Sequence, residues 1–470
     1  MTGPLGRVLV CGLGVSGAAA ARVLLARGDT VLLADAGSPA ARAELEAAGA
    51  VWLGAVTDCP DDVDLVVTSP GWRPDSPLLV SAAAAGVEVV GEPELAWRLR
   101  LPLADGQPAP WYAVTGTNGK TTTVTMLEAL LLAGGRRAVA AGNVGRPLVE
   151  VVTAVDDQGA PAFDAVAVEL SSFQLHWSSS IAPAAAAVLN VADDHVDWHG
   201  SATAYRDAKA RILQHAPVAV ADAGDPVASS LVDGHARPVT VTLDEPAPGQ
   251  LGVRAGVLVD RAFAESAELL PVADLQVRGP HNVANALAAA ALARAAGVSA
   301  ADVGTGLAGF RGGAHRSVLV ATVRDVAWVD DSKATNPHAA LASLTAHPRV
   351  VWVAGGLLKG ADVDPLVAAI APRLVGVVLL GRDRAVLEQS LARHAPAVPR
   401  IVVPSGDDVG VAGVTDGTAE AVMGEVVRAA ASLAHPGDTV LLAPAAASMD
   451  VFTDYAHRGR AFADAVRALP

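Results

Sequence analysis

Residues Trp111–Thr122 read WYAVTGTNGKTT, and this stretch decides the fold of the central part of the chain. The apolar run Trp111–Thr115 predicts a buried strand, and a glycine-rich turn joins it to a predicted helix that Gly134 ends. A strand, a turn closed by Gly-Lys-Thr and a helix are typical of a phosphate-binding P-loop, in which Lys120 reaches the β and γ oxygens and Thr121 binds Mg²⁺. The sequence therefore predicts an ATP site whose loop consists of Gly116, Thr117, Asn118, Gly119, Lys120, Thr121 and Thr122.

Acidic residues and histidines follow the next two predicted strands. The run 165–168 ends in Glu169, and the run 184–190 leads into a polar segment that holds Asp194, His195, Asp197 and His199. Carboxylates at the carboxyl ends of strands beside a P-loop suit a divalent cation. For His195 alone a polar loop without a metal explains the pattern equally well, but with Glu169 nearby the pattern favours a cation site.

Lysine is scarce in this sequence. Of the 34 basic residues only four are lysines, namely Lys120, Lys209, Lys333 and Lys359. The chain is rich in Ala, Val and Gly, a bias that replaces Lys by Arg wherever the two are equivalent, so the remaining lysines are expected where a compact or reactive amine is needed. Residues 201–215 predict a helix capped by Ser201, with Tyr205, Lys209 and Ile212 on one face.

A second glycine-rich turn lies near the N-terminus. A predicted strand, Val8–Cys11, runs into Gly12–Gly17 (GLGVSG) and an Ala-rich helix, and a second strand ends near Asp35. This is a dinucleotide-binding pattern, in which the glycines let the backbone approach a diphosphate and Asp35 could accept a hydrogen bond from a ribose or a base. NAD is the default ligand, and a tight turn without a ligand is the alternative. The loop 69–71 is expected to line the same site.

Two segments predict domain boundaries. LPLADGQPAP (101–110) has the composition of a linker, and GFRGGA (309–314) is a glycine-rich turn. Strands and helices alternate along most of the chain, which predicts an α/β protein with three domains. We expect a Rossmann-like N-terminal domain at 1–105, a central P-loop ATPase-like domain at 106–313 and a Rossmann-like C-terminal domain at 314–470.

The C-terminal segment has polar loops at predicted strand ends. A hairpin is expected at 317–323 and 326–329, and further strands near 350–354, 375–380, 400–403 and 439–443. Asn336 and Pro337 suit the N-cap and first position of a helix. Loops at the carboxyl ends of strands in one sheet are where ligands bind in open α/β folds.

Composition excludes several classes of protein. The chain has 470 residues and a formal net charge of −15, which argues against general binding to nucleic acid or anionic membranes. Two cysteines, Cys11 and Cys59, do not form a disulfide framework and suit a reducing compartment. With neither a signal-peptide layout nor a good membrane span, a cytoplasmic protein is expected. We also expect it to be a monomer.

Taken together, these motifs resemble those of the Mur ligases, ATP-dependent amide-forming enzymes that build the peptidoglycan stem peptide. The shared marks are GTNGKTT, the strand end at Glu169, Asp194-His195, His281-Asn282 and His315-Arg316. Within the family, ELSSFQL (169–175), DDSKATNPH (330–338) and APAAASMDVF (443–452) resemble the branch that adds D-glutamate to UDP-N-acetylmuramoyl-L-alanine. The motifs are spread over essentially the whole chain.

The resemblance implies a role for each motif. The N-terminal domain would hold the uridine nucleotide of the substrate instead of NAD, through Gly14, Val15, Ser16, Gly17, Asp35, Ser69, Pro70 and Gly71, with Asn143 from the central domain. ATP would also contact Asn282, Asn285, Arg316 and Asp331. D-glutamate would be surrounded by Lys333, Thr335, Lys359, Ser448 and Tyr455.

The resemblance also implies a mechanism. ATP would convert the substrate carboxylate to an acyl phosphate, which the amine of D-glutamate then attacks, and Lys120, Glu169, His195 and Lys209 would be the catalytic residues. One Mg²⁺ would take Thr121 and Glu169, and a second Glu169 and His195, with Lys209 carbamylated by CO₂ to bind or orient it. Closure of the C-terminal domain over the central one would exclude water.

Three alternatives remain open from the sequence. One is another amide ligase of the same fold, such as folylpolyglutamate synthase or a different Mur ligase. The second is an NAD-dependent dehydrogenase, an interpretation that only the Gly12–Gly17 motif supports. The third is a nucleotide-binding regulator without enzymatic activity.

Overall fold

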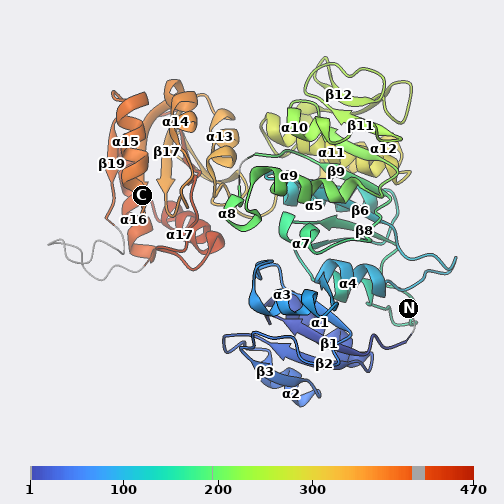
Figure 1. The fold of residues 1–470 in the computed structure, drawn as a ribbon. Helices are drawn as coiled ribbons and strands as arrows, with labels where there is room; N and C mark the ends of the chain where they lie inside the picture. The colour runs from blue at the N-terminus through green and yellow to red at the C-terminus, as the bar shows by residue number, and fades with distance from the viewer. Residues whose placement is uncertain (1–2, 193, 405–418, 470) are drawn as a thin grey trace. The chain divides into compact units, whose positions relative to one another are not determined.

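Three β-sheets follow one another along the chain in the computed structural model, which describes residues 3–192, 194–404 and 419–469 (Figure 1). The N-terminal sheet has five strands, the central sheet nine and the C-terminal sheet six. The chain forms two compact units: Met1–Leu275 with Ala284–Phe310, and Gln276–Val283 with Arg311–Pro470. The prediction of an α/β protein with three domains is confirmed.

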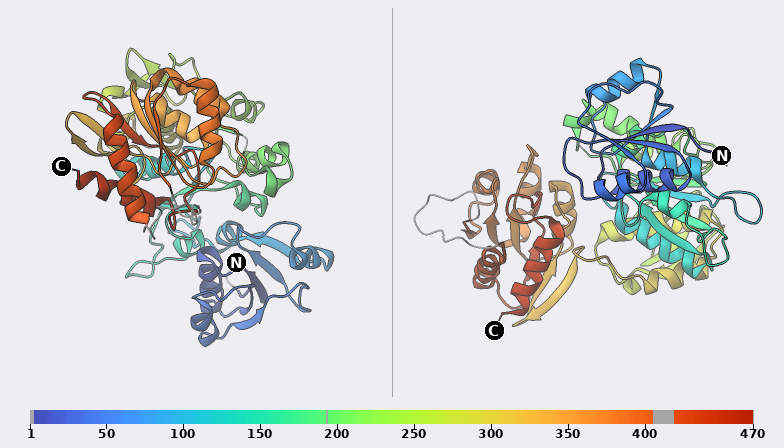
Figure 2. Two further views of the ribbon diagram at one scale, coloured as in Figure 1. Left: turned by 90° about the vertical axis from the view of Figure 1, so that its left-hand side faces the viewer. Right: turned by 90° about the horizontal axis from the view of Figure 1, so that it is seen from below.

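The N-terminal sheet is parallel, with strand order β3-β2-β1-β4-β5. Its strands are β1 (Arg7–Cys11), β2 (Thr30–Ala34), β3 (Val51–Gly54), β4 (Leu65–Thr68) and β5 (Glu88–Gly91), and its helices are α1 (Val15–Ala26), α2 (Arg42–Ala47), α3 (Pro77–Ala84) and α4 (Glu92–Leu99). Successive side chains of β1 face opposite sides, so Val8 and Val10 pack in the core with α1 and α4, while Leu9 and Cys11 pack against α3. Helices therefore cover both faces (Figure 2), and the loops after β1, β2 and β4 meet at one edge.

The central sheet has the order β14-β13-β12-β11-β10-β9-β6-β8-β7. Its strands are β6 (Trp111–Thr115), β7 (Ala138–Gly142), β8 (Ala165–Glu169), β9 (Ala185–Val188), β10 (Ala219–Asp222), β11 (Pro238–Val241), β12 (Gln250–Arg254), β13 (Val257–Asp260) and β14 (Ala267–Pro271). The strands from β6 to β12 pair with one another in parallel. Strands β12, β13 and β14 form antiparallel hairpins. The predicted alternation of strands and helices therefore fails between residues 250 and 271.

Helices surround the parallel part of the central sheet. They are α5 (Lys120–Ala133), α6 (Leu148–Val152), α7 (Ser172–His176), α8 (Val196–His199), α9 (Ala202–Ala210), α10 (Pro226–Ser230), α11 (Pro280–Ala295) and α12 (Ala300–Gly309), with 3-10 turns η1 (Arg211–Leu213) and η2 (Val272–Asp274). Strand β6 is buried throughout and lies between β8 and β9, so the P-loop that follows it starts from an interior strand of the sheet. Helix α5 ends at Ala133 with Gly134 as its C-cap, as predicted.

The C-terminal sheet is parallel except for its first hairpin and has the order β15-β16-β20-β17-β18-β19. Its strands are β15 (Val318–Val323), β16 (Val326–Asp330), β17 (Val350–Gly355), β18 (Leu374–Leu380), β19 (Arg400–Val402) and β20 (Thr439–Leu442). Its helices are α13 (Pro337–Thr345), α14 (Asp364–Ile370), η3 (Ala371–Arg373), α15 (Arg384–His394), α16 (Ala419–Leu433) and α17 (Tyr455–Arg467). Helices α13, α14 and α15 cover one face of this sheet, and α16 and α17 cover the other (Figure 1).

Two further properties of the described chain bear on the class of protein. Neither of its cysteines, Cys11 and Cys59, is in a disulfide. Across the described ranges we find no helix with the length and apolar character that crossing a membrane requires.

Candidate active site

The P-loop is formed by a left-handed turn at the start of α5. Gly119 is the N-cap of this helix with φ +83°, and a Cβ atom there would lie 2.4 Å from Oδ1 of Asn285. Glycine is therefore required at this position both for its backbone conformation and for the space. The Nζ atom of Lys120 donates to the carbonyl oxygens of Gly116 (2.8 Å) and Thr117 (2.9 Å), so its ammonium lies over the loop.

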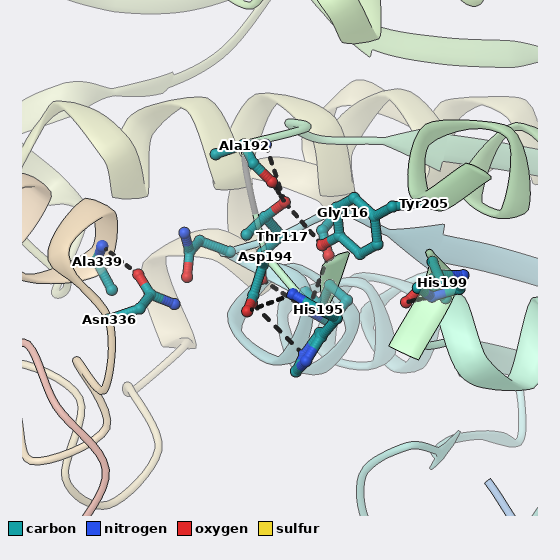
Figure 3. Close-up of polar contacts among 12 residues, drawn as sticks. Gly116, Thr117, Ala192, Asp194, His195, His199, Tyr205, Asn336 and Ala339 are labelled. Atoms are coloured by element: carbon teal, nitrogen blue, oxygen red, sulfur yellow. Dashed lines mark hydrogen bonds and ion pairs between the residues drawn. The ribbon is translucent and has the colours of Figure 1, made fainter. Parts of the chain in front are cut away.

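Side chains from the end of β9 and from α9 hold this loop in shape. Asn190 accepts from the backbone N–H of Asn118 through Oδ1 (2.8 Å) and donates to the carbonyl of Asn118 through Nδ2 (3.1 Å). The hydroxyl of Thr117 lies 3.0 Å from the hydroxyl of Tyr205 and accepts from the backbone N–H of Ala192 (Figure 3). Asn190 was not predicted to be a site residue. The scarcity of asparagine, six in the whole chain, was the available signal.

Glu169 ends β8, as predicted, and its carboxylate is only 1% exposed. Its Oε1 atom accepts from Nδ2 of Asn143 at 2.7 Å, whereas its Oε2 atom is buried and has no hydrogen-bond partner among the described residues. A buried carboxylate oxygen without a donor is costly unless a cation or another donor satisfies it. The residues present therefore fit a divalent cation at Glu169.

Lys209 is the buried lysine of α9. Its side chain lies on the face predicted from the sequence, since Tyr205, Lys209 and Ile212 are all at most 2% exposed. Its Nζ atom donates to the carbonyl of Gly116 at 2.7 Å and lies 4.5 Å from the centre of the Tyr205 ring. Burial and then the charge of Lys120 lower the pKa of Lys209 well below its ordinary value, against the opposing effect of Asp194 and Glu169.

His195 lies at the same end of the sheet but is exposed. Its φ is +51°, and its backbone N–H donates to Oδ1 of Asp194 at 3.0 Å (Figure 3). Its ring is 4.6 Å from the ring of Phe173. His199 instead points to Ser172, with Nε2 3.0 Å from the hydroxyl, and burial lowers its pKa to about 4. No cluster of three or more His, Cys, Asp or Glu side chains placed to hold a metal occurs in the described ranges. The predicted cation ligands include only two residues of those types, so this finding does not test them.

The predicted nucleotide site of the N-terminal domain is built around the carboxylate of Asp35. Its Oδ2 atom accepts from the backbone N–H of Leu13 (2.7 Å) and its Oδ1 atom from that of Gly37 (2.8 Å). The hydroxyl of Ser69 donates to the carbonyl of Gly12 at 2.6 Å. Both side chains therefore shape the glycine-rich loop. Val15, the first residue of α1, is 76% exposed. Ser16 and Gly17 follow in the first turn of α1, and Pro70 and Gly71 follow Ser69.

In the second unit, the segment after β16 meets the start of α17. The ammonium of Lys333 lies 3.8 Å from the centre of the Tyr455 ring, and the hydroxyl of Ser332 donates to the carbonyl of Tyr455. Arg458, only 1% exposed, donates to the hydroxyl and carbonyl of Ser332 and to the carbonyl of Ala446. Burial lowers its pKa to about 10. Arg458 could not be singled out from the sequence, because nothing around it distinguishes it from the exposed arginines of the chain.

The other two loops of the predicted amino-acid site are bonded to each other. Leu357 and Ala447 exchange backbone hydrogen bonds of 2.8 and 2.9 Å, so the loop that carries Lys359 runs beside the loop that carries Ser448. Ser448 is 3% exposed. Thr335 follows in the same segment as Lys333, and Asn336 caps α13 through Ala339 N, as predicted (Figure 3).

The residues predicted to contact ATP are divided between the two units. Asn285 lies beside the P-loop, with Oδ1 3.3 Å from the hydroxyl of Thr123. Asn282, Arg316 and Asp331 belong to the other unit. Burial raises the pKa of Asp331 to about 6, although the charge of Arg316 opposes the shift. The structure therefore brings Lys120, Asn143, Glu169 and Lys209 together within one unit.

Three families match successive parts of the chain. Residues 6–91 match the Mur ligase MurD-like N-terminal domain, residues 114–293 the Mur ligase middle domain and residues 315–446 the Mur ligase glutamate ligase domain. The chain belongs to the Mur ligase family.

Curated relatives cover nearly the whole chain and share one name. The UDP-N-acetylmuramoylalanine--D-glutamate ligase of Thermobifida fusca is 54% identical, with 98% of both chains covered. The proteins of that name from Mycolicibacterium smegmatis and Streptomyces avermitilis are 51% and 52% identical, with 99% and 98% of this chain and 97% and 98% of theirs covered.

Solved structures of other Mur ligases share the fold. UDP-N-acetylmuramate-alanine ligase MurC from Thermotoga maritima gives a TM-score of 0.58 at 20% identity, over 98% of this chain and 99% of that one. MurF from Acinetobacter baumannii gives 0.59 at 18% identity, over 94% of this chain and 91% of that one. At these identities the likeness concerns the fold alone.

Proposed function

We propose that this chain ligates D-glutamate to UDP-N-acetylmuramoyl-L-alanine with hydrolysis of ATP to ADP and phosphate, a step in the synthesis of peptidoglycan precursors. The observation that carries the proposal is the convergence of Lys120, Lys209 and Glu169 around the P-loop. The 54% identity to a curated ligase over 98% of the chain supports the choice of this substrate pair within the family.

The chemistry of amide formation explains why these charges converge. A carboxylate is a poor electrophile, so the substrate is activated by transfer of the γ-phosphoryl group of ATP, which gives an acyl phosphate. The amine of D-glutamate attacks the acyl carbon, the C–O bond to phosphate breaks so that phosphate leaves with the bonding electrons, and the nitrogen loses one proton to water. Lys120 and the backbone N–H groups of the loop would stabilise the phosphoryl group during transfer.

Two Mg²⁺ ions complete the proposal. Thr121, Glu169 and His195 would hold them, and bound Mg²⁺ offsets the negative charge of the nucleotide phosphates. Asn143 would fix the Glu169 carboxylate through its 2.7 Å hydrogen bond, which leaves Oε2 for a cation.

We further propose that Lys209 is carbamylated. A neutral Lys209 amine would attack the carbon of CO₂, forming an N–C bond while one C=O electron pair moves to oxygen, and the nitrogen then loses a proton to water. The buried position of Lys209, together with its lowered pKa, supports the neutral amine that this reaction needs. The product is an anion at the end of a side chain that was a cation.

We assign the sites for the uridine nucleotide and for D-glutamate to the N-terminal and C-terminal sheets. The loops at Gly14–Gly17, Asp35 and 69–71 would hold the uridine nucleotide, and Lys333, Thr335, Lys359, Ser448 and Tyr455 would surround D-glutamate. The same proposal includes domain boundaries near 105 and 313 and closure of the C-terminal domain. It also includes a cytoplasmic location and a monomeric state.

Phosphate release tests the function directly. The protein is incubated with ATP, Mg²⁺ and UDP-N-acetylmuramoyl-L-alanine, with D-glutamate or L-glutamate as the amine. We expect release with D-glutamate only. Release only with another Mur substrate, or with a folate and L-glutamate, would assign a different ligase of the same fold. No release under any combination would favour a regulator, and NAD binding with no response to the uridine nucleotide would favour a dehydrogenase.

A further inference from the structure

Asp383 has a side chain that the proposed reaction does not use. It occupies the N-cap position of α15 but makes no side-chain hydrogen bond to that helix. Its Oδ2 atom instead accepts from the backbone N–H of Leu358 at 2.7 Å, and its own backbone N–H donates to the carbonyl of Gly356 at 3.1 Å. Both groups of Asp383 therefore bind the loop 356–359, which follows β17.

This loop has a backbone conformation that needs support. Lys359 has φ +55°, a left-handed conformation uncommon for a residue with a side chain, and Gly356 has φ +132°. Such conformations persist only where the surrounding structure holds them. The hydrogen bonds between Leu357 and Ala447 hold the loop on one side, and Asp383 holds it on the other.

The segment that carries Asp383 is itself fixed by the loop that follows β20. The backbone N–H of Arg382 donates to Oδ2 of Asp450 at 2.8 Å. A Cβ atom at Gly381 would lie 2.6 Å from both the backbone of Gly356 and the carboxylate of Asp450, so the segments are in close contact. Loops after β17, β18 and β20 therefore interlock, and Asp383 supplies the side-chain contact to the residue next to Lys359.

We infer that Asp383 is a positioning residue for the amino-acid site. By fixing the N–H of Leu358 it would set the direction of the Lys359 side chain and its spacing from the loop of Ser448. This inference rests on the proposed function, in which Lys359 and Ser448 bind D-glutamate. It predicts that Asp383 acts through its ability to accept a hydrogen bond and not through its negative charge.

Asparagine and alanine at position 383 separate these two roles. Asn keeps an oxygen that accepts from Leu358 N–H and removes the charge, whereas Ala removes both. We expect Asp383→Ala to raise KM for D-glutamate about tenfold, the size of effect expected from losing one hydrogen bond that aligns a binding group. Asp383→Asn should stay within about twofold of the wild-type KM. KM for ATP should be unchanged in both variants.

Asp362→Ala is the matched control. Asp362 lies in the segment after Lys359 and likewise accepts one backbone N–H, that of Asp364 at 2.9 Å, but it contacts no residue of the loop 356–359 in the bonds described. This variant should keep the wild-type KM for D-glutamate. Thermal unfolding of all three variants shows whether each is folded.

The outcomes separate the inference from the proposed function. Wild-type protein that releases no phosphate with D-glutamate would end the proposed function before any variant is made. With an active wild type, an unchanged KM for D-glutamate in Asp383→Ala would overturn the inference. A KM in Asp383→Asn raised as far as in Asp383→Ala would also overturn it, because that result assigns the effect to charge. A fall in kcat with equal KM values would assign Asp383 to stability alone.

Discussion

The Nζ atom of Lys209 lies 2.7 Å from the carbonyl oxygen of Gly116, the first residue of the P-loop. Lys209 in α9 therefore donates a hydrogen bond to the turn that follows β6, although 93 residues separate Lys209 from Gly116 in the sequence. This amine is buried and its pKa is lowered, so we expect that arginine cannot replace lysine at position 209.

Lys209→Arg is expected to lower phosphate release by at least about 100-fold, because a guanidinium stays protonated and does not form a carbamate. Phosphate release is measured at fixed CO₂, with and without a small carboxylate that can take the place of the carbamate. The matched control is Arg206→Lys, a conservative change at an exposed position of the same helix, which should leave turnover unchanged. Wild-type turnover in a folded Lys209→Arg protein, without bicarbonate or a carboxylate, would contradict carbamylation.

Glu169→Gln should separate activity from stability. The substitution keeps an oxygen for Asn143 Nδ2 and removes a buried charge, so the midpoint of thermal unfolding should be equal or higher, while phosphate release falls at least about 100-fold. Unfolding with and without Mg²⁺-nucleotide provides the second measurement, since the variant should lose the stabilisation that the wild type gains. A variant that stays active with the wild-type dependence on Mg²⁺ would exclude Glu169 as a ligand.

Substitution of two glycines in the N-terminal loop should affect different properties, stability at Gly17 and substrate binding at Gly14. A Cβ atom at Gly17 would lie 1.9 Å from the carbonyl oxygen of Gly12, whereas one at Gly14 would meet no atom within 4 Å. Gly17→Ala should therefore lower the stability of the protein by about 1–3 kcal/mol. Gly14→Ala should leave stability unchanged and raise KM for the uridine nucleotide substrate, because the new methyl group would occupy space next to the diphosphate.

Denaturant unfolding and substrate kinetics measure these two effects independently. KM for ATP serves as the internal control, because it should respond to neither change when the protein is folded. Equal KM values for the uridine nucleotide substrate in wild type and Gly14→Ala would remove this loop from the substrate site.

Glu92 predicts a dependence of stability on pH. It is 1% exposed, accepts from the backbone N–H of Val149 at 2.7 Å, and burial raises its pKa from 4.5 to about 7. Between these two values the folded state holds a proton that the unfolded state has released. The free energy of unfolding should therefore decrease as pH rises from about 4.5 to about 7, by about 3 kcal/mol in all.

Glu92→Gln tests this dependence, since glutamine does not ionise. The variant should gain stability relative to the wild type as pH rises towards 7, and the difference should be constant above about pH 8. Chemical unfolding at several pH values between 5 and 8 gives the comparison. Parallel curves for the two proteins over that range would show that Glu92 ionises in the folded protein as readily as in the unfolded chain.

Sequence patterns predicted the local elements of the site well. The structure confirms the strand β6, the Gly119 turn, the Gly134 C-cap and the caps at Ser201 and Asn336. Each of these features depends on residues that are neighbours in the sequence. The burial of Lys209 follows from helical periodicity for the same reason.

Contacts between distant segments could not be predicted in this way. Asn143 binds Glu169 across 26 residues, and Asp383 binds Leu358 across 25, because sheet topology brings them together. The hairpins β12 to β14 were also missed, since β12 and β14 are short and only partly buried, although β13 is apolar and mostly buried. Assignment of the substrate residues rested on resemblance to a family, and the kinetic experiments above are its test.

The hydrogen bonds that hold the P-loop, between Asn190 and Asn118 and from Ala192 N–H to Thr117, also bear on how fast nucleotide can bind. These bonds come from the protein itself, so the turn keeps its shape by internal contacts. A loop that folds only around phosphate loses conformational entropy at each binding event, whereas a loop held in advance has already lost it during folding. Association of nucleotide with this domain should then be limited by diffusion and desolvation, and the slow conformational step of the catalytic cycle should lie elsewhere in the chain.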